Sequence, residues 1–300
     1  MEAASSAAMT SPAPPPAAPF DVSLRRVRRE RASRLGIVGE NPLLQRITED
    51  LLDRLSMVSR RFERALDLGC GPGLLTRSLR SGRIDVTPCD AGGGFAAALG
   101  GLRHEEDVLP FLPGSFDLVV SAGVLDSVND LPGALVQIRR LLRPDGLFLG
   151  AFVGAGSLQR LKRAMQAADE AEARPASAHV HPQIDVRAAG DLLSRAGFAL
   201  PVADVEPINV RYTGLPQLVG DLRELAWTNI LASRSRQPFG RLGYAAAQAA
   251  FADGADPDGR ITERFEIIQL SGWAPSPDQP QPARRGSATA SLSEALKPKP

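Results

Sequence analysis

The sequence predicts a doubly wound α/β fold, in which a mainly parallel sheet carries helices on both faces. Apolar strand-like runs alternate with helical patterns between residues 60 and 155, and the turns between them are short. This alternation is typical of parallel sheets, because each crossover between parallel strands uses a helix. Aromatic residues make up 5% of the 300 residues and apolar residues 43%, which predicts a core built mainly from Ala, Leu, Val and Ile.

Two helices are expected before the sheet. Residues 23–34 contain six arginines in a helix-compatible stretch, which we interpret as a solvated helical face. The alternative is a basic arm that grips an acidic partner or RNA. Residues 41–55 have Asn41 in the N-cap position, Pro42 in the first turn and apolar residues at helical spacing, so we expect an amphipathic helix.

The central region supplies five of the expected strands. The expected strands are residues 64–69, 84–90, 102–107, 116–124 and 147–153, of which 102–107 has the weakest pattern. The expected helices between them are residues 74–82, 95–102 and 131–146. The last of these helices closes on Pro144-Asp145-Gly146, a stop and turn signal.

The second half predicts two more strands among helices, which gives a seven-stranded sheet. Its expected elements are helices at 157–173 and 185–198, a loop at 179–184, strands at 201–212 and 264–274, and mainly helical patterns at 215–253. We therefore expect a leader at 1–20 that lacks signal-peptide features, one domain at 21–274 and an extended tail at 275–300. Within the domain, a helical extension precedes a core at 60–155, and helical insertions occupy 156–264.

Charge and composition exclude several classes of protein. The formal net charge of +1 argues against a protein-wide attraction to DNA or to anionic lipid. No apolar run approaches the ~18 residues of a membrane-spanning helix, which leaves open only peripheral contact with a membrane. The two cysteines, Cys70 and Cys89, form no disulfide framework and are expected to pack as small apolar residues. Trp227 and Trp273 are expected in the core, with the lining of a substrate cleft as the alternative.

A glycine-rich loop at residues 67–73, Asp-Leu-Gly-Cys-Gly-Pro-Gly, follows the first central strand and opens a helix. Glycines let the backbone approach a ligand closely, and a helix N-terminus suits a carboxylate or a phosphate. The pattern lacks the Gly-Lys-Ser/Thr of a P-loop, and Leu74 breaks the dinucleotide fingerprint. Asp67 would repel a pyrophosphate but attract an ammonium group. The loop therefore favours the amino-acid end of a ligand.

Further acids follow at the spacing that a nucleoside would need. Asp90 ends the second strand, where a carboxylate can accept hydrogen bonds from ribose hydroxyls. The acidic turn at 105–107 precedes Leu109 and Phe111 and could meet an adenine amino group. Asp117 is expected to fix a loop rather than to touch the ligand.

The ordered set of glycine loop, strand-end acid, acidic turn and "SFDLVVS" resembles the class I S-adenosylmethionine-dependent methyltransferases over residues 60–155. The resemblance implies a Rossmann-like class I methyltransferase fold, an enzyme, and S-adenosylmethionine as cofactor. The cofactor-binding residues that it implies are Asp67, Gly69, Cys70, Gly71, Gly73, Asp90, Ala91, Glu105, Glu106 and Ser121.

A narrower likeness covers nearly the whole chain beyond the leader. The segments "FDVSLRRVRRERAS", "VNDLPGALVQIRRLLRPDGLFLGAFVG" and "RRGSATASLSEALK" are similar to a bacterial and mitochondrial family of complex I assembly factors with protein-arginine hydroxylase activity. Malonyl-carrier methyltransferases of biotin synthesis are similar in the core. Asp126 and Ser127 depart from the His-Trp that many relatives carry. The likeness implies a protein substrate, with an iron–sulfur subunit of complex I as the candidate, in the bacterial cytoplasm or the mitochondrial matrix.

The chemistry stays open between three functions: methyl transfer to a protein, hydroxylation of a protein arginine, and chaperoning with a structural cofactor. Methyl transfer needs an in-line nucleophile and a sheltered site. The segment "SAGVLDS" lacks the Asn/Asp-Pro-Pro-Tyr/Phe of amino-group methyltransferases of nucleic acids or glutamine. Hydroxylation needs an oxygen-activating centre, for which His179, His181 and Asp185 are a conceivable set. A polar loop is the interpretation we favour for these histidines, so we predict no metal site and assign no catalytic residue.

Overall fold

The computed structural model describes residues 18–35 and 41–279. In this part of the chain seven strands form one sheet, in the order β3-β2-β1-β4-β5-β7-β6. The strands are β1 (Arg64–Leu68), β2 (Asp85–Asp90), β3 (Leu102–Arg103), β4 (Phe116–Ala122), β5 (Leu142–Val153), β6 (Ala199–Tyr212) and β7 (Ile261–Trp273). Strands β1 to β5 are parallel, and β7 runs antiparallel to both β5 and β6. The predicted seven-stranded, mainly parallel sheet is confirmed.

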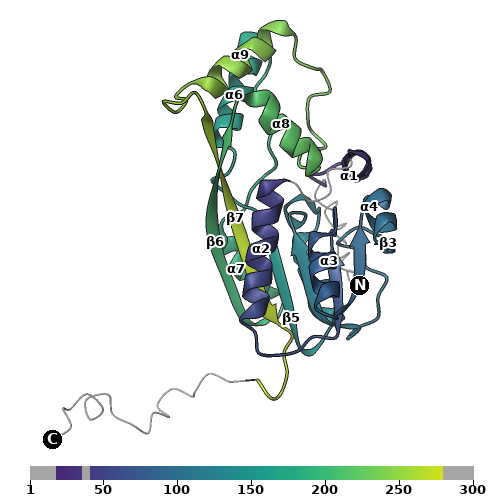
Figure 1. Ribbon diagram of the computed structural model, residues 1–300. Coiled ribbons are helices and arrows are strands. Elements are labelled where there is room, and N and C mark those ends of the chain that lie inside the picture. Colours follow the sequence, from purple (N-terminus) through teal and green to yellow (C-terminus); the bar gives the residue numbers. More distant parts are fainter. Residues whose placement is uncertain (1–17, 36–40, 280–300) are drawn as a thin grey trace, which may run out of the picture.

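Helices cover both faces of the sheet (Figure 1). They are α1 (Val22–Arg34), α2 (Pro42–Ser56), α3 (Leu74–Ser81), α4 (Gly93–Ala98), α5 (Leu131–Leu141), α6 (Gln159–Ala171), α7 (Val186–Arg195), α8 (Leu215–Glu224) and α9 (Arg241–Ala252), with a 3₁₀ turn η1 (Leu125–Ser127). Ile47 of α2 and Leu79 of α3 belong to one apolar core, whereas Ile138 of α5 and Leu193 of α7 belong to the other. The two cores sandwich the sheet and hold its strand ends in place.

The long pair β6 and β7 extends beyond the rest of the sheet (Figure 1). Helices α6, α8 and α9 gather near its far end, where Tyr212 of β6 pairs with Ile261 of β7. Buried Leu161 of α6 and Phe251 of α9 join the same apolar core as α2 and α3. These helices lie between strands β5 and β7 in the chain, as the predicted insertions do.

Local signals fix the ends of several elements. The Asn41 side chain accepts hydrogen bonds from the amides of Leu43 and Leu44, so the predicted N-cap of α2 is confirmed. The Asp117 carboxylate accepts hydrogen bonds from the amides of Glu63 and Arg64. Asp117 therefore holds the chain at the start of β1, in keeping with its expected structural role.

The expected helix at 131–146 is wrong in its last turn. Helix α5 ends at Leu141, and β5 begins at once, with Leu142 paired to Phe116 of β4. Pro144 cannot continue a helix, and Asp145 takes a positive φ of 62°. The Pro-Asp-Gly turn lies inside β5, where the register against β4 shifts between Phe116 and Leu118. It bends a strand rather than separating a helix from a strand.

Part of the predicted termini lies outside the described residues. This holds for 1–17 of the leader and for 280–300 of the tail, including "RRGSATASLSEALK". Among the residues that the structure covers, no helix combines the length and the apolar character needed to cross a membrane.

Candidate functional site

The glycine loop between β1 and α3 has a backbone that only glycine adopts easily. Gly69, Gly71 and Gly73 have φ values of 75°, 49° and 84°. A Cβ at Gly69 would collide with Val124, and one at Gly73 would come within 2.7 Å of Leu99. A Cβ at Gly71 would make only ordinary van der Waals contact, with Arg29 Nη2 and the Gly69 carbonyl oxygen each at 3.9 Å. The loop is thus packed tightly at its two ends and less tightly in its middle.

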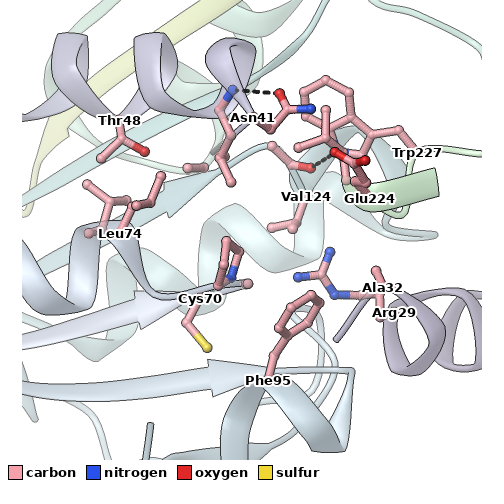
Figure 2. Close-up of a pocket in the computed structure, with 18 of the residues that line it drawn as sticks. Arg29, Ala32, Asn41, Thr48, Cys70, Leu74, Phe95, Val124, Glu224 and Trp227 are labelled. Atoms are coloured by element: carbon pink, nitrogen blue, oxygen red, sulfur yellow. Dashed lines mark hydrogen bonds between the residues drawn. The ribbon is translucent and has the colours of Figure 1, made fainter. Parts of the chain in front are cut away.

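A pocket lies over this loop at the carboxyl ends of β1 and β4. Four of the predicted cofactor residues line it, namely Asp67, Gly69, Cys70 and Gly71. Further walls come from α2, from residues 122–124 after β4 and from the end of α8 with Trp227. Figure 2 shows Arg29 of α1 and the Phe95 ring inside this pocket, with Cys70 on the opposite side. We call this cavity the loop pocket.

Asp67 lies buried on the floor of the loop pocket with one strong side-chain partner. Its Oδ2 atom accepts a hydrogen bond of 2.5 Å from the Thr76 hydroxyl. Burial raises the pKa of Asp67 to about 6, and the negative charge of Asp90 adds to this effect while Thr76 opposes it. No cation of the described residues forms a salt bridge with this carboxylate, and Arg80 acts on it only from a distance, so it can receive a positively charged group.

Asp90 has the opposite environment, although it ends the neighbouring strand. Its Oδ1 accepts hydrogen bonds from Arg29 Nε at 2.7 Å and from the Gly92 amide at 2.7 Å. Its Oδ2 accepts from Arg29 Nη2 at 2.5 Å and from the Gly71 amide at 2.9 Å. Burial alone would raise the pKa of Asp90, but the Arg29 guanidinium holds it below its usual range. A carboxylate has about four acceptor positions, and all of them are used here.

A second arginine of α1 binds the acidic turn that follows β3. Arg25 Nη1 lies 2.8 Å from Glu105 Oε2 and 2.7 Å from Glu106 Oε2, and Arg25 Nε donates to the Ser127 hydroxyl. Arg25 and Arg29 are only 4% and 5% exposed. The expected solvated face at 23–34 is therefore wrong for these two arginines. They are buried because each meets carboxylates of its own chain.

The predicted cofactor residues thus fall into two groups. Asp67, Gly69, Cys70 and Gly71 come together around the loop pocket, and Gly73 begins α3 behind it. The lining of that pocket does not include Asp90, Ala91, Glu105, Glu106 or Ser121. Ser121 is buried on β4, and its hydroxyl has no partner within the described part of the chain. Whether this second group touches a cofactor stays a prediction.

Both cysteines are buried and unsuited to act as thiolates. Burial raises the pKa of Cys89 to about 12, and it raises the pKa of Cys70 further. The expected apolar packing is confirmed for both side chains.

A second cavity of about 180 Å³ shares Trp227 with the loop pocket. Its apolar walls include Leu161 and Met165 of α6 and Leu222 of α8. Asp126 of η1 reaches it from the side of β4, and the loop with His179 and His181 closes another side. We call it the Asp126 cavity.

The two loop histidines have partners of their own. His181 Nε2 accepts a hydrogen bond from the Ile230 amide, and burial lowers the pKa of His181 to about 4. His179 Nε2 lies 2.8 Å from Asp169, while Asp185 caps α7 through the Ala188 amide. The conceivable set of His179, His181 and Asp185 is therefore not assembled. Among the described residues no group of three His, Cys, Asp or Glu side chains is placed to hold a metal ion.

Comparison with known proteins agrees with this geometry. A profile of the methyltransferase domain matches residues 42–201. The chain is 31% identical to "Arginine-hydroxylase NDUFAF5, mitochondrial" of Danio rerio, over 93% of this chain and 89% of that protein. The identity to the Homo sapiens protein of the same name is 33%, over 92% and 82%. The chain belongs to the methyltransferase family.

A further relative and two solved structures extend this likeness. A malonyl-[acyl-carrier protein] O-methyltransferase of Laribacter hongkongensis is 31% identical over 78% of this chain and 84% of its own. The crystal structure of Bacillus YcgJ superimposes with a TM-score of 0.53 at 14% identity, over 76% of this chain and 99% of that one. The crystal structure of the [4+2]-cyclase SpnF superimposes with a TM-score of 0.51 at 15% identity, over 87% of this chain and 98% of that one. These two structures support the fold alone.

The structure adds site residues that the sequence analysis did not assign, chiefly Arg25, Arg29 and the pocket role of Trp227. For the two arginines, the sequence carried one signal of a shared role. Arg25 and Arg29 are four residues apart and thus share one face of a helix. Trp227 and Trp273 both pack against the apolar core, as expected, and Trp227 also lines both cavities.

Proposed function

We propose that this methyltransferase-family enzyme binds S-adenosylmethionine in the loop pocket and modifies a protein during the assembly of respiratory complex I. The observation that carries the proposal is the loop pocket itself, whose lining combines the buried Asp67 carboxylate, which no cation of the described residues pairs with, and the loosely packed Gly71. The full-length similarity to proteins named arginine hydroxylases supports the protein substrate.

The methionine end of the cofactor fits the residues present. Asp67 offers a buried carboxylate to the ammonium group, and the space at Gly71 lets a ligand approach the backbone. The N-terminus of α3 follows Gly73, has no side-chain cap and suits a carboxylate. When bound, the cofactor supplies a methyl group on a positively charged sulfur.

The ribose end does not fit the residues as they stand. Asp90 has no acceptor position left for a hydroxyl, because Arg29 and two backbone amides use all four. Glu105 and Glu106 are paired with Arg25, although the Oε1 atom of Glu106 has no hydrogen-bond partner among the described residues. Ribose can bind at Asp90 only if Arg29 leaves that carboxylate.

Hydroxylation of a protein arginine is the second candidate for the reaction, and the similarity to the NDUFAF5 arginine hydroxylases favours it. An iron–sulfur subunit of complex I is the candidate substrate for either reaction. The reaction would take place in the cytoplasm of a bacterium or in the mitochondrial matrix of a eukaryote.

Mass spectrometry of that iron–sulfur subunit, from cells with and without this protein, tests the proposal. Loss of one oxygen mass from an arginine peptide in the deletion strain would establish hydroxylation. Loss of one methylene mass would establish methyl transfer. An unchanged subunit would refute the complex I target.

A chaperone without catalysis is separated from an enzyme by variants of the loop pocket. Asp67→Ala and Gly71→Ala should abolish cofactor binding and also complex I assembly if the protein acts as an enzyme. Normal assembly without cofactor binding would refute the enzymatic role in assembly.

A further inference from the structure

The Asp126 cavity adjoins the loop pocket at the point where a protein side chain could approach a bound cofactor. Trp227 lies in the wall of both cavities, and its indole N–H donates to the Gly123 carbonyl at 2.7 Å. This bond fixes the ring against the segment that follows β4. The free volume of about 180 Å³ compares with the roughly 150 Å³ cavities that take up benzene. It suits the end of one side chain rather than a nucleoside.

Asp126 is the one carboxylate among the residues that line this cavity. Its Oδ1 atom is buried, and within the described residues it has no hydrogen-bond partner. An unpaired buried carboxylate oxygen is costly, and a ligand that pairs with it recovers that cost. The position therefore favours a ligand that donates a hydrogen bond, and most of all a positively charged donor.

Within the described residues no cation forms a salt bridge with Asp126. Burial raises the pKa of Asp126 to about 7, and a hydrogen bond from its own backbone amide and the more distant charges of Arg25 and Arg29 counteract this only in part. Arg25 is already bound to Glu105, Glu106 and Ser127. The other polar groups at the cavity, such as His181 and His179, are held by protein partners. A positive charge that enters the cavity would meet Asp126 first.

The remaining walls suit the stem and the plane of an arginine side chain. Leu161, Met165 and Leu222 offer apolar contacts for methylene groups. Trp227 also lines the cavity, and an indole ring is the aromatic group on which a guanidinium stacks best. A carboxylate pairs with the guanidinium fork through two parallel hydrogen bonds, which a compact ammonium cannot form.

We propose that the Asp126 cavity receives an arginine side chain of the protein substrate and that the Asp126 carboxylate binds its guanidinium group. This inference rests on the proposed function, because it assumes a protein substrate beside a bound cofactor. On this proposal Asp126 selects a positively charged side chain as the group to be modified. Among the described residues that line this cavity, no other acid is present.

The test compares two probes on the full-length protein saturated with S-adenosylhomocysteine. The probes are acetyl-arginine amide and acetyl-citrulline amide, which have nearly the same shape and differ in charge. Saturation-transfer difference NMR gives their dissociation constants into the millimolar range. The wild type should prefer the arginine probe by roughly tenfold or more, as a charge-assisted bond to a buried group predicts. Asp126→Asn should reduce this preference to about onefold.

Two further variants keep the result specific. Asp126→Glu keeps the charge and should retain most of the preference. Asp191→Asn removes an acid of the same type from the exposed side of α7 and should change nothing. Equal binding of both probes by the wild type, or an unchanged preference in Asp126→Asn, would overturn the proposal. Failure of the proposed function has a different signature: the wild type would then not bind S-adenosylhomocysteine at all.

Discussion

The two ends of the predicted cofactor site use the same residue type in opposite ways. Asp67 and Asp90 end adjacent parallel strands, and both are buried. Asp67 has a hydroxyl partner and a raised pKa, whereas Asp90 is saturated by Arg29 and two amides and has a lowered pKa. The difference shows that a strand-end acid is defined by the charges around it. The Asp67 end can still bind a cation, whereas at the Asp90 end an arginine of the chain already binds the carboxylate.

Helix α1 causes this asymmetry. Its two buried arginines bind the acids that were predicted to meet ribose and adenine, and neither of them forms a salt bridge with Asp67. A cofactor with a nucleoside would have to compete with α1 at one end only. Changes in α1 should therefore act on stability and on nucleoside binding together, while changes at Asp67 should act mainly on binding.

The largest expected effect follows the loss of Arg29. Arg29→Ala leaves the Asp90 carboxylate buried without its cation, which typically costs about 3–5 kcal/mol. We expect the free energy of unfolding in urea to fall by that amount. Saturating S-adenosylhomocysteine should then raise the melting temperature of the variant by more than it raises that of the wild type, because Asp90 has acceptor positions free for ribose.

Arg26→Ala is the matched control for this prediction. Arg26 also pairs with an acid, Glu105, but its side chain is 46% exposed. Such a pair contributes less than about 1 kcal/mol. Equal losses in both variants would show that the burial of the Arg29–Asp90 pair has no energetic role.

A smaller effect on stability and a clear effect on binding are expected at Asp67. Asp67→Asn keeps a polar partner for Thr76 but removes the charge offered to the cofactor. The affinity for S-adenosylmethionine, measured by calorimetry, should fall roughly tenfold to a hundredfold, since a charge-assisted hydrogen bond contributes about 1.5–3 kcal/mol. Asp90→Asn should show the reverse pattern, with a large loss of stability. Equal losses of stability in Asp67→Asn and Asp90→Asn would contradict the proposed difference between the two acids.

The pH dependence of cofactor affinity should follow the pKa of Asp67. This pKa is raised to about 6, so the carboxylate is mostly protonated at pH 5 and mostly ionised at pH 7. An ammonium partner needs the ionised form, so the affinity should increase about tenfold over this window and level off above it. Asp90, whose pKa is lowered, stays ionised throughout and adds no such slope. A flat profile for the wild type, or an unchanged slope in Asp67→Asn, would contradict this assignment.

The raised pKa of Asp67 affects folding stability in the opposite direction to cofactor affinity: stability falls as the pH rises. A carboxyl that prefers its protonated form in the fold stabilises the protein at low pH, and this contribution fades as pH rises from about 4 to about 6. Asp90 contributes stability that is present above about 4 and is lost in stronger acid.

The sequence was sufficient for the elements whose signals are local. Alternation of short apolar runs and helical patterns predicted β1 to β5, although β3 covers only Leu102–Arg103 of the expected 102–107. Asn41 with Pro42 predicted the start of α2. The glycine loop was readable because its acid, its glycines and the following helix are consecutive. The Pro-Asp-Gly turn misled because a turn signal does not say whether it ends a helix or bends a strand.

The partners of the site acids were beyond local reasoning. Arg29 lies 61 residues from Asp90, and Arg25 lies 80 residues from Glu105. A run of arginines has the same sequence pattern whether its side chains lie in water or bind buried carboxylates. Only the placement of α1 against the acidic turn decides between these two environments. The Asp126 cavity is likewise formed by η1, α6, α8 and a loop that are distant in the sequence.

A crystal structure of the protein with S-adenosylhomocysteine would test the contrast between the two ends most directly. The methionine end should bind with Asp67 within hydrogen-bond distance of the ammonium group. At the other end, Arg29 should have left Asp90, and the ribose hydroxyls should occupy its acceptor positions. A bound nucleoside beside an intact Arg29–Asp90 pair would contradict the account.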